Sequence, residues 1–382
     1  MEHPIRAFDT KTKSLPSILS EAAGLARNLY IDRRYPISLI QFVTNRCNAR
    51  CAFCFIDFDD PNINKGELSL SEIERLSLTM GPHLKNINLT GGEPFARKDL
   101  LDIARTWFRN TEIESIFITC NGSLPDRVER FTRTLSAEFP DRQILFSLSI
   151  DALNEKHDNI RKLPRLFDNC LQTYRMLRDL GRMGANVMAN IAITVSPDNY
   201  TSALDTYEAL TGEHGVTAMT CTAVREAGVF KLPAEQKQGI LDTYRALTQR
   251  IRDDLASGRI QGYDRSSPLG RMINRKNDLM TGIIADTYMD HQFVTPCQAG
   301  SLLAVMAADG TVSPCEVLSW PLGNVRDFDL DFMALWDSAE TAKLRKWRND
   351  TKCACTYECA WSYNILGSPK YLPALLKAAL IK

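Results

Sequence analysis

Eleven cysteines are the residues of this sequence best able to do chemistry. Six of them form two closely spaced groups, Cys47/Cys51/Cys54 and Cys353/Cys355/Cys359. Grouped thiols in a chain of 382 residues indicate metal binding or catalysis, because disulfide frameworks are typical of short secreted chains. Three other cysteines stand alone, and we expect them to be small buried apolar residues: Cys120, Cys170 and Cys221.

The first group has the pattern C-x3-C-x2-C and follows a predicted strand directly. A closed structural zinc site takes four protein ligands, and the nearest histidine, His83, is not spaced like a zinc-finger partner. Three cysteines on a four-iron cluster would instead leave one iron open to an outside ligand. The pattern therefore favours an iron–sulfur cluster, with a zinc knuckle or a chance grouping as the alternative.

Composition and charge exclude several classes of protein. Lys+Arg and Asp+Glu both number 46, so no broad basic field is available to hold a nucleic acid. The first residues, MEHPIRAFDTKTK, contain no apolar signal region, and no later run reaches the roughly 20 apolar residues of a membrane span. We expect a cytoplasmic protein without nucleic-acid or membrane partners.

Six short β-branched segments alternate with helical periodicity, which is typical of βα units around a parallel sheet. The predicted strands are 37–44, 86–90, 115–120, 144–150, 187–195 and 217–222. The predicted helices lie near 70–80, 98–110, 125–138, 166–181, 201–212 and 234–256. The fold class is thus α/β, a partial (β/α)6 barrel whose ligands are expected at the carboxyl ends of the strands.

The remaining segments complete the expected domain organisation. Residues 302–307 and 311–315 predict a β-hairpin around Asp309–Gly310, which is compatible with a type I′ turn, and a helix is expected near 331–347. Residues 371–381 predict a short amphipathic helix that docks on the protein rather than on a membrane. The expected units are an N-terminal extension (1–36), the barrel (37–225), a helical connection or substrate-covering segment (226–292), a cysteine-bearing hairpin/helix module (293–366) and a C-terminal helix (367–382).

The first cysteine motif, with Phe53 before its last cysteine, resembles the signature of the radical S-adenosylmethionine (SAM) superfamily. That resemblance implies a [4Fe-4S] cluster on Cys47, Cys51 and Cys54 whose open iron is chelated by SAM. It also implies that one electron, from a donor such as flavodoxin or ferredoxin, cleaves SAM to a 5′-deoxyadenosyl radical that abstracts hydrogen from a substrate.

Further motifs resemble the SAM-binding stretches of the family. Gly91-Gly92-Glu93 closes the second strand, and the resemblance implies that it contacts the amino group of SAM. The third and fourth strands end in Asn121 and Ser149, and Ser149 is a candidate for the ribose or carboxylate end of SAM. Arg161 suits a bidentate carboxylate clamp. Asn190 is a candidate for the adenosine pocket, and a polar residue satisfied by backbone is the equally weighted alternative.

The C-terminal cysteines resemble the auxiliary-cluster region of the SPASM and twitch subfamilies. Such a region has about seven cysteines, whereas five are found here, which implies one auxiliary [4Fe-4S] cluster. The expected ligands are Cys297, Cys315, Cys355 and Cys359, with Cys355 preferred over Cys353 because side chains one residue apart diverge in an extended segment. Structural zinc is the main rival occupant.

The sequence is compatible with two classes of substrate. We expect a small metabolite such as a sugar or aminocyclitol, because 36 residues before the barrel are too few for a peptide-binding winged-helix domain. The alternative is maturation of a ribosomal peptide or a protein side chain. No residue can be named as a catalytic base, and a non-catalytic zinc-binding module is the alternative of another class.

Overall fold

A computed structural model describes residue 20 and residues 23–380. Its strands form one sheet in the order β6-β5-β4-β3-β2-β1-β7-β8-β9. Strands β1 to β7 pair in parallel with one another, whereas the β7–β8 and β8–β9 pairs are antiparallel. The strands are β1 Ser38–Thr44, β2 Asn86–Gly91, β3 Ser115–Cys120, β4 Gln143–Ser149, β5 Val187–Val195, β6 Met219–Ala223, β7 Leu303–Met306, β8 Thr311–Ser313 and β9 Gly323–Asn324.

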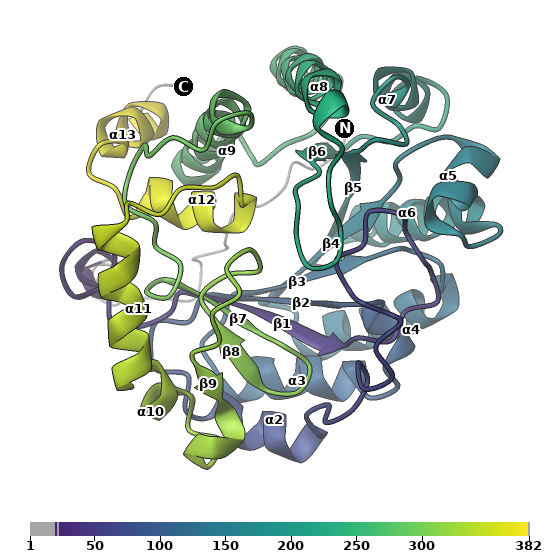
Figure 1. Cartoon of the computed structure of the whole chain (residues 1–382). Helices are drawn as coiled ribbons and strands as arrows, with labels where there is room; N and C mark the ends of the chain where they lie inside the picture. Colours follow the sequence, from purple (N-terminus) through teal and green to yellow (C-terminus); the bar gives the residue numbers. More distant parts are fainter. Residues whose placement is uncertain (1–19, 21–22, 381–382) are drawn as a thin grey trace.

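Helices follow most of the parallel strands and cover the outer face of the sheet (Figure 1). The helices are α2 Leu70–Ser77, α3 Leu100–Asn110, α4 Pro125–Glu138, α5 Asn154–Arg161, α6 Leu166–Arg182, α7 Ala203–Gly212, α8 Lys237–Ser257, α9 Pro268–Thr287, α10 Phe332–Trp336, α11 Ala339–Asp350, α12 Glu358–Leu366 and α13 Leu372–Leu380. Short helical turns lie at Asn28–Asp32, Pro94–Ala96, Ala234–Gln236 and Val325–Phe328.

The first six strands curve as a partial barrel rather than closing on themselves, because β6 ends the sheet on one side and β1 continues into β7 on the other. The open side is covered by α9, which packs against α12 and α13 (Figure 1). The predicted partial α/β barrel is therefore confirmed. Alternating burial explains the strands: Ile87, Leu89, Ile116 and Ile118 are fully buried under the outer helices.

All six predicted barrel strands and the six predicted helices that follow them are present, with ends shifted by a few residues. Three helices were not predicted individually, α5, α9 and α12, and the helix expected near 331–347 is two helices separated at Ser338, which caps α11 through the backbone N–H of Thr341. Residues 226–292, expected to be a helical connection, contain α8 and α9.

The hairpin turn is not type I′. Gly310 has a φ of 89°, but Asp309 is not among the described residues with positive φ, and a type I′ turn needs positive φ at both central positions. The N–H of Gly310 instead donates to the carbonyl of Ala307, which closes the turn one residue earlier.

Two expectations fall partly outside the described residues. The structure does not describe residues 1–19 and 21–22, which make up much of the expected N-terminal extension. It also does not describe residue 381, the last residue of the predicted tail helix. Within the described residues, no helix is long and apolar enough to cross a membrane.

Candidate functional site

The cysteine loop, residues 45–54, leaves the carboxyl end of β1 and is fixed by backbone hydrogen bonds to the end of α5. The N–H groups of Arg50 and Ala52 donate to the carbonyls of Arg161 and Ile160, at 2.9 and 3.3 Å. The three thiols of the loop are half-buried, and burial raises their pKa values, that of Cys47 to about 12. The three thiols also raise each other's pKa where they interact, so they lie near one another.

The Gly91-Gly92-Glu93 turn packs directly on the first residues of this loop. The N–H of Gly92 donates to the carbonyl of Thr44, and that of Glu93 to the carbonyl of Arg46, both at 2.8 Å. A Cβ on Gly91 would lie 2.1 Å from the Thr44 carbonyl oxygen, and one on Gly92 would lie 2.4 Å from that of Arg46. Both glycines are thus required by close backbone approach to the cysteine loop.

Glu93 places a buried carboxylate beside the cysteine loop. It is 1% exposed, and its two oxygens accept hydrogen bonds from the N–H groups of Phe95 and Asn121, at 3.0 and 2.8 Å. Burial raises the pKa of Glu93 to about 7, and Glu93 in turn raises the pKa of Cys47. Each carboxylate oxygen keeps a second lone pair, so Glu93 can accept a further bond from an ammonium group.

Asn121 and Ser149 occupy neighbouring strand ends. The Asn121 side chain donates to Asn48 in the cysteine loop at 2.9 Å and accepts from the N–H of Ser123, so it serves the loop itself. Asn48 donates in turn to the Ser123 hydroxyl at 2.8 Å. Ser149 is half-buried at the end of β4, and its hydroxyl makes no hydrogen bond within the described part of the chain.

Arg161 lies against the cysteine loop rather than in open space. Its Nε donates to Asp151 at 2.7 Å, its Nη1 lies 3.8 Å from the sulfur of Cys51, and its guanidinium faces the Phe53 ring. Asp151 is fully buried and also accepts from the N–H of Thr194. The guanidinium of Arg161, which Asp151 holds in place, therefore lies with its positive charge beside the thiols.

Asn190 lies apart from these residues. It is in the middle of β5, its amide donates to the Thr220 hydroxyl on β6 at 2.7 Å, and it lines a large cavity inside the curved sheet. By register it pairs with Ser147, one side-chain layer below Ser149. No described contact joins Asn190 to Glu93, Arg161 or the cysteine loop.

The C-terminal thiols come from three separate segments: Cys297 precedes β7, Cys315 follows β8, and the last group joins α11 to α12. Four of them, Cys297, Cys315, Cys355 and Cys359, pack in one cluster with Ile40 and Phe42 of β1. A small cavity is lined by Cys297, Cys353 and Cys355. Burial, and then the thiols of Cys297 and Cys315, raise the pKa of Cys353 to about 11. The pKa of Cys355 is raised by burial and by the other three thiols, so these four thiols form one neighbourhood.

Cys359 has a different environment. It lies in the first turn of α12, and its pKa is raised to about 12 by burial and then by Glu316, while Arg225 lowers it. Arg225, at the end of β6, pairs with Glu316 at 3.0 Å and with Glu358 at 2.7 Å. The structure thus brings Cys353 toward Cys297, Cys315 and Cys355, and sets Cys359 beside this ion triad.

The donor sets fit the cofactors that the sequence implies. Three thiols, an adjacent buried carboxylate and a guanidinium offer soft ligands for iron, an acceptor for an ammonium and a partner for a carboxylate. Among the described residues, no three histidine, cysteine or acidic side chains converge closely enough to hold one metal ion. A four-iron cluster instead takes each thiolate on a different iron.

Comparison with known proteins agrees with this arrangement. The Radical SAM superfamily model matches residues 42–209, and the SPASM model, an iron-sulfur cluster-binding domain, matches residues 297–360. The chain is 25% identical over 334 residues to the sporulation killing factor maturation protein SkfB of Bacillus subtilis (strain 168), covering 85% of this chain and 70% of that protein. It is 26% identical over 322 residues to the AdoMet-dependent heme synthase of Methanosarcina barkeri, covering 82% and 85%.

Solved structures have the same fold. Native anSMEcpe with bound AdoMet and Cp18Cys peptide superimposes with a TM-score of 0.56 at 19% identity, over 90% of this chain and 99% of that one. The site and the fold therefore define an iron–sulfur enzyme that uses SAM. This chain belongs to the radical SAM superfamily and has a C-terminal SPASM region. Its cofactors are therefore a [4Fe-4S] cluster that binds SAM and auxiliary iron–sulfur binding in the SPASM region.

Several residues of the site were not singled out from the sequence: Asn48, Asp151, Arg225, Glu316 and Glu358. Asp151 and Arg225 each follow a strand end by two residues, a position at which a charged residue could have been noted. Glu316 and Glu358 each adjoin a cysteine in sequence, but their shared contact with Arg225 depends on the folded chain.

Proposed function

We propose that this enzyme cleaves SAM reductively and abstracts hydrogen from a peptide or protein substrate, which it thereby matures. The observation that carries the chemistry is the packing of the Gly91–Glu93 turn on the three-cysteine loop, because it sets a carboxylate beside thiols that leave one iron open. The substrate class is supported by the similarity to SkfB, a maturation protein, over most of the chain, and by a peptide in a structure of the same fold.

In this proposal Cys47, Cys51 and Cys54 hold the cluster, Glu93 accepts from the amino group of SAM, and Arg161 presents its charge to the thiolates and the carboxylate end. When bound, the cluster and SAM supply an electron and a hydrogen-abstracting radical. Asp151 orients Arg161 through the 2.7 Å bond. The hydroxyl of Ser149, half-buried at the end of β4, is available to the SAM ribose.

We further propose Cys297, Cys315, Cys353 and Cys355 as the auxiliary ligands. Three of these thiols line one small cavity, and all four belong to one electrostatic neighbourhood. This set replaces Cys359, the ligand expected from sequence, by Cys353. The reason is that Cys359 lies in the first turn of α12, where Glu316 and Arg225 are the charged groups with the largest effect on its pKa.

The small-metabolite substrate preferred from sequence is replaced by its alternative. That preference relied on the number of residues before the barrel, whereas the similarity to SkfB extends over 85% of the chain. A haem-type substrate is the second candidate, because the similarity to the AdoMet-dependent heme synthase is as extensive.

The test is anaerobic reconstitution with iron and sulfide counting and a dithionite assay for 5′-deoxyadenosine. We expect about eight irons per chain. Replacing Cys47, Cys51 and Cys54 together by alanine should leave about four irons and no 5′-deoxyadenosine. Cys120→Ala, at a buried solitary cysteine, is the matched control and should keep both. A colourless zinc protein without 5′-deoxyadenosine formation would refute the proposal.

The substrate class is tested separately by mass spectrometry. Candidate precursor peptides, small metabolites and haem precursors are incubated with enzyme, SAM and dithionite, and each is examined for a loss of hydrogen that accompanies 5′-deoxyadenosine formation. We expect modification of a peptide. Modification of a haem precursor alone would replace the peptide by the second candidate.

A further inference from the structure

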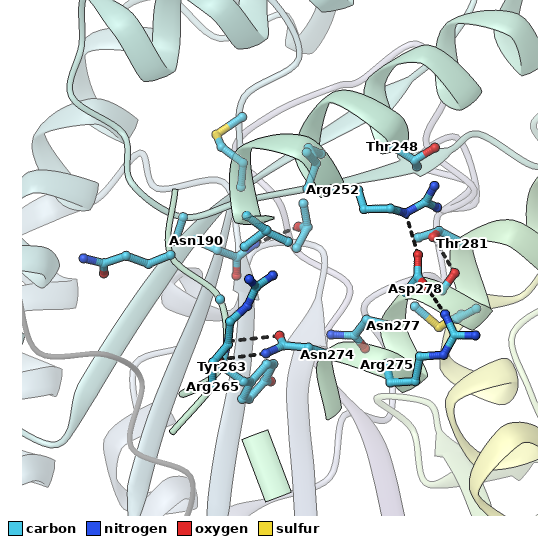
Figure 2. Close-up of a pocket in the computed structure, with 18 of the residues that line it drawn as sticks. Asn190, Thr248, Arg252, Tyr263, Arg265, Asn274, Arg275, Asn277, Asp278 and Thr281 are labelled. Atoms are coloured by element: carbon cyan, nitrogen blue, oxygen red, sulfur yellow. Dashed lines mark hydrogen bonds and ion pairs between the residues drawn. The ribbon is translucent and has the colours of Figure 1, made fainter. Parts of the chain in front are cut away.

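A cavity of about 890 Å³ lies inside the curved sheet, enclosed between the strands and the helices that cover the open side. This volume is in the range of pockets that bind ligands. The wall formed by the strands is largely apolar, with Phe117, Leu145 and Met188, and its polar positions are Ser147, Asn190 and Thr220. The opposite wall comes from α8, α9 and α13. Figure 2 shows Thr248 and Arg252 of α8 and Asn274 to Thr281 of α9 on this side.

Strand register places the cavity directly below the proposed SAM site. Asn190 pairs with Ser147, and Ala192, two residues on, pairs with Ser149 at the strand end. Because every second side chain of a strand shares a face, Ser147 and Asn190 form the layer next to Ser149 on the inside of the sheet. A ligand in the cavity therefore occupies the same interior as the proposed reacting centre.

The lining of this cavity is strongly basic although the chain has no formal net charge. Its only carboxylate among the described residues is Asp278, and its basic side chains are Arg252, Arg265, Arg271, Arg275 and Lys377. Five cations against one anion, on an otherwise apolar cavity, make it complementary to a ligand that is both apolar and anionic.

Three of the five cations already have partners. Figure 2 shows Arg252 and Arg275 reaching Asp278 from two sides, the first at 2.5 Å. Arg271 donates to the carbonyls of Ala378 and Ala379 near the end of α13, at 3.2 and 2.5 Å. These residues hold α8, α9 and α13 together.

Two cations remain for a ligand. The side chains of Arg265 and Lys377 make no hydrogen bond or ion pair with any described residue, and both are exposed while lining the cavity. They come from the loop before α9 and from α13, so they reach the cavity from different segments.

We propose that this cavity binds an apolar peptide segment through a carboxylate, which Arg265 and Lys377 receive while its apolar neighbours contact Phe117, Leu145 and Met188. The peptide as occupant rests on the proposed function. The carboxylate is an acidic side chain or a chain terminus of the substrate. Bound in this way, the segment extends toward the layer of Ser149.

The test uses two fluorescent probes on the reconstituted enzyme. Anilinonaphthalene sulfonate is apolar and anionic, and N-phenyl-1-naphthylamine is its uncharged counterpart. We expect Arg265→Gln/Lys377→Gln to weaken binding of the anionic probe about fivefold, the size expected for two solvent-exposed ion pairs, and to leave the neutral probe unchanged. The matched control, Lys98→Gln/Arg130→Gln, removes the same charge from exposed positions outside the cavity and should change neither.

A blocking variant locates the probes. Ala374→Phe fills the cavity from α13 and should weaken both probes. Unchanged binding of both would refute the cavity as the site, and an equal effect of the two charge-removing variants on the anionic probe would refute the roles of Arg265 and Lys377.

Competition distinguishes a peptide carboxylate from the carboxylate of a haem-type ligand. A short peptide of leucine, phenylalanine and glutamate should displace the anionic probe better than its glutamine counterpart. Displacement by haemin but not by the peptide would overturn the peptide assignment. The uncoupled formation of 5′-deoxyadenosine, measured in parallel, should be unchanged in Lys98→Gln/Arg130→Gln, and its absence in the wild type would contradict the proposed function independently of probe binding.

Discussion

The two groups of thiols are built in opposite ways. Cys47, Cys51 and Cys54 lie in one loop that is fixed by backbone contacts to the Gly91–Glu93 turn and the end of α5. The C-terminal thiols come from three segments between Cys297 and Cys359, brought together by the β7–β8 hairpin and the connection from α11 to α12. The first site depends on local geometry, whereas the second depends on tertiary packing.

This difference determines which kind of substitution should disrupt each cysteine site. A local site held by close backbone approach is sensitive to a single added methyl group, because a backbone neighbour cannot move aside as a side chain can. A site assembled from distant segments is sensitive to the ion pairs that hold those segments in place. Changes of each kind should therefore separate the two sites.

The largest effect is expected for Gly92→Ala. The added Cβ would lie 2.4 Å from the carbonyl oxygen of Arg46 and so displace the cysteine loop. We expect loss of 5′-deoxyadenosine formation and of about half the iron, with the auxiliary iron retained. Gly282→Ala on α9 is the control, because its Cβ would meet no atom within 4 Å. Full iron content in Gly92→Ala would show that the loop tolerates displacement.

The next effect concerns the auxiliary ligands. Cys353→Ala and Cys355→Ala should each lower the iron content by up to about four atoms per chain, whereas Cys359→Ala should keep it. Iron counting and the electron paramagnetic resonance signal of the reduced protein measure this. If Cys359→Ala loses the auxiliary iron and Cys353→Ala does not, the set expected from sequence is correct.

A third change breaks the packing that assembles the C-terminal site. Arg225→Met leaves the side chains of Glu316 and Glu358, each 14% exposed, without their cation. Removing one partner of a buried ion group costs about 3 kcal/mol, so anaerobic denaturation should show a loss of that size. Arg225→Met/Glu358→Gln should recover part of it. A loss below about 0.5 kcal/mol would mean that water compensates the two carboxylates.

The same contrast explains what could be predicted from the sequence. The barrel strands and the first site follow from short-range patterns: β-branched runs and the spacing of Cys47, Cys51 and Cys54. The proposed exchange of Cys359 for Cys353 could not be predicted, because the charged groups around Cys359, Glu316 and Arg225, are brought there by tertiary packing. The cavity below the proposed SAM site was not predicted, because α8, α9, α13 and the loop before α9, which provide its basic residues, are distant in sequence from most of the strands that line it.

The smallest expected effect is a pH-dependent loss of stability that should affect the first cysteine site before the second. His157 on α5 is fully buried, its Nδ1 accepts from the N–H of Asp151 at 3.1 Å, and burial lowers its pKa to about 4, with Arg161 adding to the decrease. The neutral imidazole is therefore the folded form. Its contribution to stability is complete above the unfolded pKa of about 6.5 and is lost as pH falls from there toward 4.

Between pH 7 and 5 the protein should lose about 1 to 2 kcal/mol of stability through this histidine. His157→Asn, whose amide oxygen can accept the same N–H and does not titrate, should flatten that slope in anaerobic denaturation curves. His214→Asn, at a half-buried histidine on the far side of Phe167, is the control and should keep it. Because the end of α5 bonds the first cysteine loop through the carbonyls of Ile160 and Arg161, the pH-dependent loss should appear in 5′-deoxyadenosine formation before it appears in auxiliary iron. Simultaneous loss of both would mean that the two sites unfold as one unit.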